Sequence, residues 1–400
     1  MSKTIKAAER LKGFDYAIRN IIFEAQKAEK NGTTVHYLNI GDPVLFGFKT
    51  PPHLIEAVEK AMRDGQNGYT PAAGIISARE AVSAEYAGQG INISPDRVIL
   101  TSGTSEGIEL AITAIADQND EVLLPLPAYP FYTGVLNKLG SQAVYYRTDP
   151  SRNWEPDLDQ VRQLIGPRTR ALVVINPNNP TGAVYSKDTQ IELLNIADQH
   201  NLVLLADEVY ADLAYDAPIP SLGSLNPESP VISFSSASKA YMAPGWRTGW
   251  MAVGGSARLN KILKGIKDLA DGRLCSNGPM QHAVAAALLG DRSYQNTFRN
   301  QLRIRAELTT KRLNNIDGIK CVPPAAAFYA MPKIELPSGR TDQDFILGLL
   351  HDTGVLCVYG SGFGMKPTDG FFRIVYLATP DKLNTFFDAI EAFTDKFLQS

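Results

Sequence analysis

One lysine in this 400-residue chain stands in surroundings that suit covalent chemistry. Lys239 lies in the segment S-F-S-S-A-S-K-A-Y-M-A-P-G-W-R-T-G, which runs from Ser233 to Gly249, and Arg247 follows it by eight positions. A lysine that reacts as an amine needs a dry pocket, often with a second cation nearby, to lower its pKa. It also needs small neighbours that let a flat ligand reach its nitrogen. This segment supplies the cation and the small neighbours, although the pattern alone also fits a surface lysine in a serine-rich turn.

The elements that must position this lysine form a regular series. Seven short apolar segments are predicted to be strands, at 97–101, 121–124, 142–147, 171–175, 202–207, 230–234 and 248–253. Helical patterns lie among them at 105–116, 129–139, 157–165 and 188–199. This alternation predicts an α/β domain with a largely parallel, seven-stranded sheet between layers of helices. Because ligands bind beyond the carboxyl ends of such strands, the residues that follow each strand are the candidate site.

The turn after the first strand predicts an anion site. Ser102-Gly103-Thr104-Ser105 opens a helix, where free N–H groups and the helix dipole favour a phosphate. Residues 103–107 also match G-x-S-x-G, the nucleophile elbow of a hydrolase. A hydrolase that used Ser105 would need an acid and a histidine on loops after strands. The histidines well downstream, His282 and His351, fall in helical patterns instead.

Three further positions suggest polar recognition. Residues 176–182, N-P-N-N-P-T-G, form an extended loop that could aim the amide of Asn179. Asp207 closes an apolar strand and needs a partner for its charge, such as a protonated ring nitrogen, a helix N-terminus or a salt bridge. Arg373 lies inside the apolar segment 371–376, where its planar fork would suit the carboxylate of a ligand or of an internal acid.

The composition narrows the class of protein. With 44% hydrophobic residues, 20% charged residues and a net charge of −3, the chain is typical of a globular protein, and we expect no nucleic-acid or membrane partner. Its three cysteines are far apart and lack C-x-x-C spacing, so we expect no disulfide framework or zinc site and a reducing compartment. The N-terminal residues contain no apolar leader, and the cytoplasm is the expected location.

The chain is expected to divide into a large and a small domain. Residues 1–45 would form an N-terminal arm and part of the small domain, with a helix at 16–29 and a strand at 35–40. Residues 46–289 would form the large ligand-binding domain, and residues 290–400 the small α/β C-terminal domain. A long helix at 291–313 would link the last two.

In this order, these residues closely resemble the class I aminotransferases, which are pyridoxal 5′-phosphate (PLP) enzymes of fold type I. N-P-N-N-P-T-G and S-x-S-K…R-x-G carry the resemblance, which covers nearly the whole chain. Within that family, the blocks L-N-I-G-D-P (38–43), G-F (47–48), N-P-N-N-P-T-G-A-V-Y-S (176–186) and C-S-N-G-P-x-Q-H-A (275–283) look most like alanine (glutamate–pyruvate) aminotransferases. The resemblance therefore implies ping-pong transamination between an L-amino acid and a 2-oxo acid. The best match is L-alanine with 2-oxoglutarate, giving pyruvate and L-glutamate.

The resemblance also implies roles for individual residues. Lys239 would hold PLP covalently and move a proton, and Asp207 would pair with the pyridine N–H. Asn179 and Tyr210 would bind the phenolic oxygen, and Tyr129 would stack on the ring. The phosphate would be held by Gly103, Thr104, Ser105, Ser236 and Arg247. Gly41, Asn179 and Arg373 would bind the α-carboxylate of the substrate. The candidates for contact with the substrate side chain are Tyr16, Phe46, Phe48 and Arg273.

Tyr69 matches a tyrosine that reaches the phosphate of the neighbouring subunit, so the resemblance implies a homodimer with shared active sites. Several alternatives stay open on the sequence. The enzyme could be an aspartate, aromatic or other aminotransferase, or a PLP lyase that uses nearly the same residues. A serine acyl enzyme at Ser105 or Ser236 and a non-catalytic ligand sensor are the alternatives from other classes.

Overall fold

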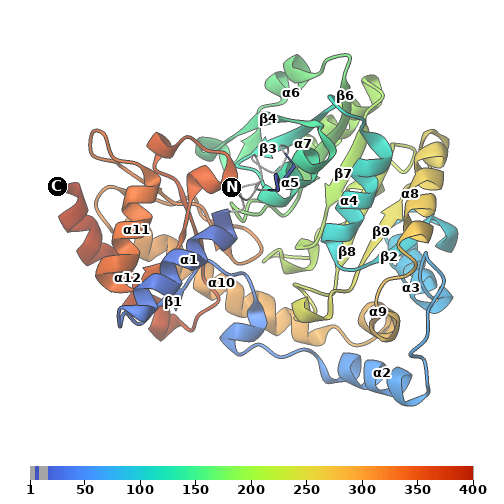
Figure 1. Ribbon diagram of the computed structural model, residues 1–400, viewed down its shortest axis with the longest axis horizontal. Helices are drawn as coiled ribbons and strands as arrows, with labels where there is room; N and C mark the ends of the chain where they lie inside the picture. Colours follow the sequence, from blue (N-terminus) through green and yellow to red (C-terminus); the bar gives the residue numbers. More distant parts are fainter. Residues whose placement is uncertain (1–4, 9–16, 400) are drawn as a thin grey trace.

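The computed structural model describes residues 5–8 and 17–399, with side chains from residue 21 onward in the second range. Its larger part is built around an eight-stranded sheet with the order β2-β9-β8-β7-β6-β3-β4-β5 (Figure 1). The strands are β2 (Val98–Thr101), β3 (Glu121–Leu126), β4 (Gln142–Asp149), β5 (Glu155–Pro156), β6 (Thr169–Ile175), β7 (Val203–Asp207), β8 (Val231–Ser236) and β9 (Gly249–Val253). All seven expected strands are present. The eighth, β5, is a two-residue edge strand, too short to show a periodic pattern.

Strand directions bring one set of ends together. Strands β8, β7, β6, β3 and β4 are parallel, whereas β9 is antiparallel to both β8 and β2. Strand β2 consequently points the same way as β8. The carboxyl ends of β2, β6, β7 and β8 therefore lie at one edge of the sheet, where β9 begins.

Helices bury both faces of this sheet. Val173 and Ile175 pack in a cluster with α4 (Thr104–Ile115), α5 (Pro130–Leu139) and α8 (Asn260–Gly272). Leu172 and Val174, their neighbours in the strand, pack in a separate cluster with α6 (Leu158–Leu164) and α7 (Lys187–Gln199). Burial of both faces explains why these strands read as continuous apolar runs rather than as alternating patterns.

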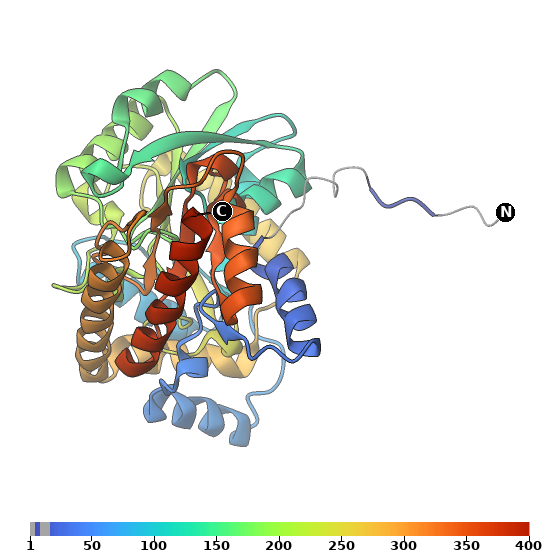
Figure 2. The same ribbon diagram turned by 90° about the vertical axis from the view of Figure 1, so that its left-hand side faces the viewer.

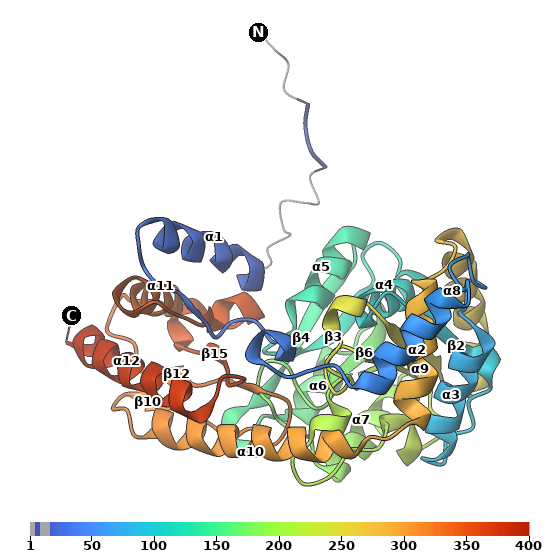
Figure 3. The ribbon, with the colours of Figure 1, turned by 90° about the horizontal axis from the view of Figure 1, so that it is seen from below.

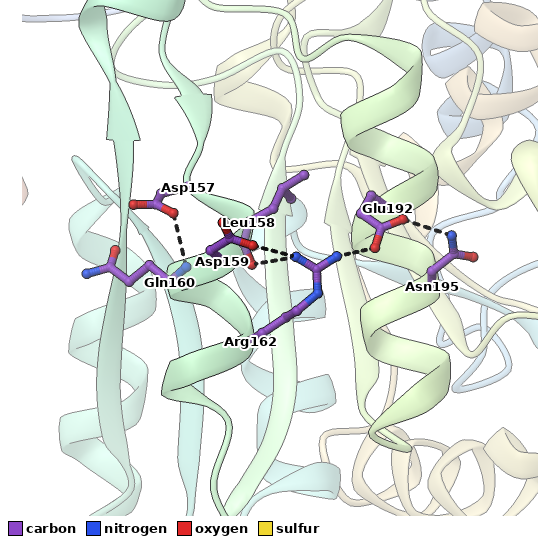
Figure 4. Close-up of polar contacts among 7 residues, drawn as sticks. All are labelled: Asp157, Leu158, Asp159, Gln160, Arg162, Glu192 and Asn195. Carbon is purple, nitrogen blue, oxygen red and sulfur yellow. Dashed lines mark hydrogen bonds and ion pairs between the residues drawn. The ribbon is translucent and has the colours of Figure 1, made fainter.

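Polar contacts join the two helices of the second layer (Figure 4). The side chain of Asp157 caps α6 by accepting a hydrogen bond from the Gln160 N–H at 3.0 Å. Arg162 of α6 donates to Asp159 at 3.2 Å and also pairs with Glu192 of α7. Because these side chains are partly exposed, we expect the pairs to fix the register of the helices more than to stabilise the fold.

A third group of helices packs beside β2 at the edge of the sheet. It comprises α2 (Pro52–Arg63), α3 (Ile76–Ala87) and α9 (Gly278–Leu289); α9 contacts both α2 and α3, and α3 contacts β2 (Figure 3). Helix α9 begins at Gly278, with a proline in its first turn. The loop between α2 and α3 carries Tyr69.

The smaller part of the molecule combines both ends of the chain. Helix α10 (Ser293–Asn314) leads into it, and α11 (Asp342–Thr353) and α12 (Pro380–Leu398) pack side by side (Figure 2). Strand β15 (Phe372–Val375) pairs with β11 (Tyr329–Ala330) and β14 (Val358–Tyr359), and β10 (Ile319–Lys320) pairs with β12 (Lys333–Ile334). Strand β1 (His36–Tyr37) pairs with β13 (Val355–Leu356), and α1 (Ala17–Lys30) contacts α11. The domain limits near residues 45 and 290 stay a prediction.

Candidate active site

A cavity of about 880 Å³ opens where β2, β6, β7 and β8 end. Its size and its mixture of apolar walls with a few polar groups suit a small-molecule site. The sequence-predicted residues that line it are Gly41, Thr104, Ser105, Tyr129, Asn179, Asp207, Tyr210, Ser236, Lys239, Arg247 and Arg373. Residues from distant parts of the chain thus meet at the edge of the sheet where the topology rule places a ligand.

Lys239 stands in the turn three residues after β8 and lines the cavity. Its Nζ donates a hydrogen bond to the backbone oxygen of Gly41 at 2.7 Å and lies 5.7 Å from the centroid of the Phe328 ring. Among the ion pairs of the described residues, none includes Lys239. The amine is therefore held at the cavity wall by a carbonyl group rather than by a carboxylate, and the surface-lysine alternative is wrong.

Asp207 is a buried acid at the end of β7. Its carboxylate accepts hydrogen bonds from the Tyr132 hydroxyl at 3.3 Å and from the Val209 N–H at 3.4 Å. Burial raises the pKa of Asp207 to about 6, and these two bonds and the charge of Lys239 oppose the rise. No ion pair in the part of the chain that the structure describes includes Asp207. A cation placed in the cavity would therefore stabilise its ionised form.

Arg373 is almost fully buried in β15 and stands between two aromatic rings. Its Cζ lies 4.7 Å from the centroid of the Tyr329 ring and 4.9 Å from that of Phe363. It donates to the Asn179 side-chain oxygen at 3.0 Å and to the Asn39 backbone oxygen at 2.6 Å. Its Nε has no hydrogen-bond partner among the described residues, and no described acid pairs with it. The internal acid considered from the sequence is thus not seen, and the guanidinium suits the carboxylate of a ligand.

The start of α4 and the Arg247 segment form an anion cradle. Gly103 has φ +80°, and a Cβ added there would lie 2.4 Å from Nη2 of Arg247. A Cβ at Gly249 would lie 2.7 Å from the Gly103 carbonyl carbon, so the two segments pack closely only because both positions are glycine. The buried Thr104 hydroxyl has no hydrogen-bond partner among the described residues. A helix N-terminus, a guanidinium and an unpaired hydroxyl together suit a phosphate.

Two tyrosines complete the walls. Tyr129 precedes α5, with its ring centroid 6.3 Å from that of Phe131. The Tyr210 hydroxyl lies 2.9 Å from the hydroxyl of Tyr329. Burial raises the pKa of Tyr210 well above its ordinary value, so Tyr210 stays protonated and can donate a hydrogen bond at neutral pH.

Several predicted residues do not line the cavity. Tyr69 is 87% exposed on its loop. Phe48 instead packs 4.5 Å from the Phe298 ring, and Phe46 packs against the same core cluster. Arg273 pairs with Glu106 at 3.3 Å and donates to the Leu100 backbone oxygen at 2.7 Å. The suggestion that these last three meet the substrate side chain is therefore not supported, and Tyr16 lies outside the described residues.

Sequence reasoning missed several residues of the cavity, among them the polar residues Asn39 and Tyr329. Asn39 is buried, and neither polar atom of its side chain has a partner among the described residues. It falls in the block L-N-I-G-D-P, which could have drawn attention to it. Tyr329 falls in an apolar stretch that reads as an ordinary buried strand, and nothing local signals the position of its hydroxyl.

The alternative chemistries find little support at this site. Among the described residues that line the cavity there is no histidine, so Ser105 has no base in the arrangement that a serine hydrolase needs. No cluster of His, Cys, Asp or Glu that could hold a metal occurs in the described ranges. None of the helices described here is long and apolar enough to cross a membrane.

Comparison with known proteins identifies the family. The model of class I and II aminotransferases matches residues 33–390. Glutamate-pyruvate aminotransferase AlaA of Escherichia coli (strain K12) is 38% identical over 387 residues, which cover 95% of each chain. Alanine aminotransferase of Mycobacterium bovis is 37% identical over 376 residues, 90% of this chain and 86% of that protein. A solved alanine aminotransferase from Pyrococcus furiosus has a TM-score of 0.95 and 40% identity, and the match covers 98% of this chain and all of that one.

The fold and these matches define a PLP-dependent enzyme of fold type I. The chain belongs to the class I and II aminotransferases, and its reaction is a transamination. The residues of the cavity fit the cofactor. The cradle suits its phosphate, the unpaired Asp207 suits its ring nitrogen, and the Lys239 amine suits its aldehyde.

The raised pKa of Asp207 predicts a pH-dependent effect of Asp207→Asn on stability. In cofactor-free protein, the ionised carboxylate is penalised in the folded state, so stability is lost as pH rises from about 4 to the folded pKa of about 6. Asp207→Asn should therefore unfold at higher urea concentration than wild type at pH 8, by roughly 3 kcal/mol. This difference should vanish below about pH 4.

Adding PLP at pH 8 should stabilise wild type more than Asp207→Asn. Glu208→Gln is the matched control, because burial also raises the pKa of Glu208, to about 7, but its carboxylate bonds Ser221 and the Leu222 N–H instead of lining the cavity. Glu208→Gln should leave the stabilisation of the folded protein by PLP unchanged. If PLP stabilised Asp207→Asn as much as it stabilised wild type, this assignment of Asp207 would be contradicted.

Proposed function

We propose that this enzyme transfers the amino group of L-alanine to 2-oxoglutarate, giving pyruvate and L-glutamate, by a ping-pong mechanism with PLP bound to Lys239. The observation that carries the proposal is the meeting of Lys239, Asp207 and Arg373 in one cavity, where none of them forms an ion pair with a described residue. The names of the relatives in Escherichia coli and Pyrococcus furiosus support the substrate pair.

The cofactor would be held at both ends. Asp207 would pair with the ring nitrogen, Asn179 and Tyr210 would donate to the phenolic oxygen, and Tyr129 would lie against the ring. The phosphate would bind Gly103, Thr104, Ser105, Ser236 and Arg247. When bound, PLP supplies an aldehyde that condenses with amines and a protonated ring that withdraws electrons from the substrate Cα.

The remaining steps belong to side chains of this protein. Arg373 and Asn179, with the Gly41 backbone, would bind the substrate α-carboxylate and so turn its Cα toward Lys239. Nζ of Lys239 would then accept the proton from Cα as general base and return it as general acid. Asp207 would keep its negative charge throughout, because a cation beside it offsets the cost of its burial.

The cationic residues of the cavity walls bear on the choice of amino donor. The cationic side chains among its described lining residues are Lys239, Arg247 and Arg373, and each has a place in this scheme. No described lining residue is left to pair with a second carboxylate, and this holds for the second carboxylate of 2-oxoglutarate as well as for that of L-aspartate. The lining residues therefore do not separate L-alanine from L-aspartate as donors, and the names of the relatives support L-alanine. Other transaminations, and a PLP lyase on the same scaffold, would use nearly the same residues.

A panel of amino donors tests the choice of substrate. With 2-oxoglutarate as acceptor, L-alanine should give a higher kcat/KM than L-aspartate or an aromatic amino acid, with equal amounts of pyruvate and L-glutamate formed. Ammonia released in place of L-glutamate would indicate a lyase. A higher kcat/KM for L-aspartate or L-tyrosine would contradict the proposed donor.

Lys239→Ala tests the covalent link. Wild type treated with PLP and borohydride should carry the cofactor on the peptide that contains Lys239, as mass spectrometry can show. Lys239→Ala should carry none, and loss of the acid–base group should reduce turnover by about 10²–10⁴-fold or more. Lys264→Ala, at an exposed lysine of α8, is the control and should behave as wild type. Normal transamination by Lys239→Ala would refute the proposal.

Arg373→Leu tests the carboxylate site. Loss of the guanidinium should weaken binding of both amino acid and oxo acid by roughly 2–5 kcal/mol, because a bidentate partner is removed. Binding of PLP, measured by fluorescence titration, should change much less. Arg373→Lys retains the charge without the planar fork and should recover part of the substrate affinity. Equal losses of cofactor and substrate binding would count against this role.

We also propose a cytoplasmic homodimer with shared active sites. Tyr69 is 87% exposed outside the cavity of its own chain, and Ile76 and Leu274 are also exposed, at 51% and 59%. The Gln281 side chain bonds Thr70 at 3.0 Å and so ties the Tyr69 loop to α9. Exposed apolar side chains of this kind suit an interface with a second copy of the chain. The three cysteines, all free thiols, agree with a reducing compartment.

Tyr69→Phe tests the shared site. If the hydroxyl reaches the partner's phosphate, its loss should weaken PLP binding about tenfold or more while the dimer stays intact in sedimentation. Tyr37→Phe is the control, because its hydroxyl bonds Glu29 at 2.9 Å and it does not line the cavity. A fully active monomer in sedimentation would contradict the shared site.

A further inference from the structure

Tyr329 lies where three groups of the active site meet. It is buried in β11, which belongs to the smaller part of the molecule and pairs with β15, the strand that carries Arg373. Its hydroxyl lies 2.9 Å from that of Tyr210, and its ring centroid lies 4.7 Å from Cζ of Arg373. A Cβ added at Gly41 would lie 2.2 Å from the Tyr329 hydroxyl oxygen, so the segment whose carbonyl binds Lys239 passes directly against this tyrosine.

We propose that Tyr329 is a positioning residue that acts through both Tyr210 and Arg373. Its hydroxyl directs the Tyr210 proton into the cavity, and its ring orients the Arg373 guanidinium for a carboxylate. This inference rests on the proposed function, because it assigns Tyr329 to the same cofactor and the same substrate carboxylate.

The first half of the proposal follows from the two hydroxyl groups. In the pair, either oxygen can donate to the other. When Tyr210 donates its proton to an acceptor in the cavity, such as the phenolic oxygen of PLP, the bond between the two tyrosines is kept only if Tyr329 is its donor. A hydroxyl that accepts a hydrogen bond is itself a stronger donor, so Tyr329 strengthens the bond that Tyr210 makes to the cofactor.

Other charged and titratable groups face this pair from several elements. Asp207 ends β7, Lys239 follows β8, Tyr129 precedes α5, and Arg373 lies in β15. For Asp207, Lys239 and Arg373, none of the described hydrogen bonds goes to the Tyr210 hydroxyl. The hydrogen bond described for the Tyr210 hydroxyl joins it to Tyr329, which is therefore placed to donate to it.

The second half follows from the packing of Arg373. Its guanidinium stands between the rings of Tyr329 and Phe363, and its two hydrogen bonds go to Asn179 and Asn39. A guanidinium over the face of an aromatic ring is attracted to that face, and this attraction fixes its position. The ring of Tyr329, rather than its hydroxyl, is thus expected to matter for carboxylate binding.

A second tyrosine pair provides a matched control. The hydroxyls of Tyr215 and Tyr376 lie 2.5 Å apart and are also buried between the larger and smaller parts of the molecule. Neither residue lines the cavity. Tyr376→Phe therefore removes a comparable buried hydrogen bond at a residue that does not line the cavity.

The test uses PLP-loaded wild type, Tyr329→Phe, Tyr329→Leu and Tyr376→Phe. Three quantities are measured: the midpoint pH of the absorbance change of bound PLP without substrate, the dissociation constant of propionate as an unreactive carboxylate, and the melting temperature. The bond from Tyr210 stabilises negative charge on the phenolic oxygen, so weakening it should raise the midpoint pH.

Tyr329→Phe should raise this midpoint by about half a unit to one unit, with unchanged propionate affinity. Tyr329→Leu should also weaken propionate binding about fivefold. Tyr376→Phe should alter neither quantity, even if its melting temperature falls. In a Tyr210→Phe background, adding Tyr329→Phe should cause no further shift of the midpoint.

An unshifted midpoint in Tyr329→Phe, or an equal shift in Tyr376→Phe, would overturn the inference while leaving the proposed function intact. A wild type that bound PLP without forming the link to Lys239 would overturn both. If Tyr329→Phe does not fold, 3-fluorotyrosine at position 329 provides the second test. Its more acidic hydroxyl donates more strongly and should lower the midpoint, and a raised or unchanged midpoint would refute the proposal.

Discussion

A buried carboxylate that forms no ion pair with the described residues governs the architecture of this active site. Asp207 closes the central strand β7, where it accepts hydrogen bonds from the hydroxyl of Tyr132 and the N–H of Val209, and the charge of Lys239 acts on it without an ion pair. Burial raises its pKa to about 6, which is a cost to the folded protein at neutral pH. The cost is removed when a ligand brings a positive charge to this place. Binding of the cofactor and the electronic activation of its ring are therefore two consequences of one electrostatic arrangement.

The sheet places the other groups around that carboxylate. Because β9 runs against its neighbours, the segment before it returns Arg247 to the edge where β2 ends and α4 begins. Glycines at 103 and 249 let these two segments approach closely enough to form the phosphate cradle. The substrate end is built differently. Arg373 comes from the smaller part of the molecule and bonds Asn179 of the larger part, so the relative placement of the two parts determines the carboxylate site.

Much of this arrangement could be predicted from the sequence. Lys239 and Asp207 follow apolar strands, and a parallel sheet brings such positions to one edge whatever the distance between them in the chain. The supporting contacts could not be predicted. Tyr329 reads as an ordinary core residue, and only the pairing of β11 with β15 brings its hydroxyl to Tyr210. Arg273 reads as a free cation near the ligand, yet it holds Glu106 at the start of α4. Such contacts depend on tertiary packing, which leaves no periodic signal.

The protonation of the cofactor nitrogen tests the central claim most directly. PLP labelled with ¹⁵N in its ring can be bound to wild type and to Asp207→Asn, and its nitrogen chemical shift can be followed by NMR at pH 8. If the carboxylate of Asp207 binds a cationic ring, the nitrogen should be protonated in wild type and unprotonated in Asp207→Asn. An unprotonated nitrogen in wild type, or equal shifts in the two proteins, would contradict the account.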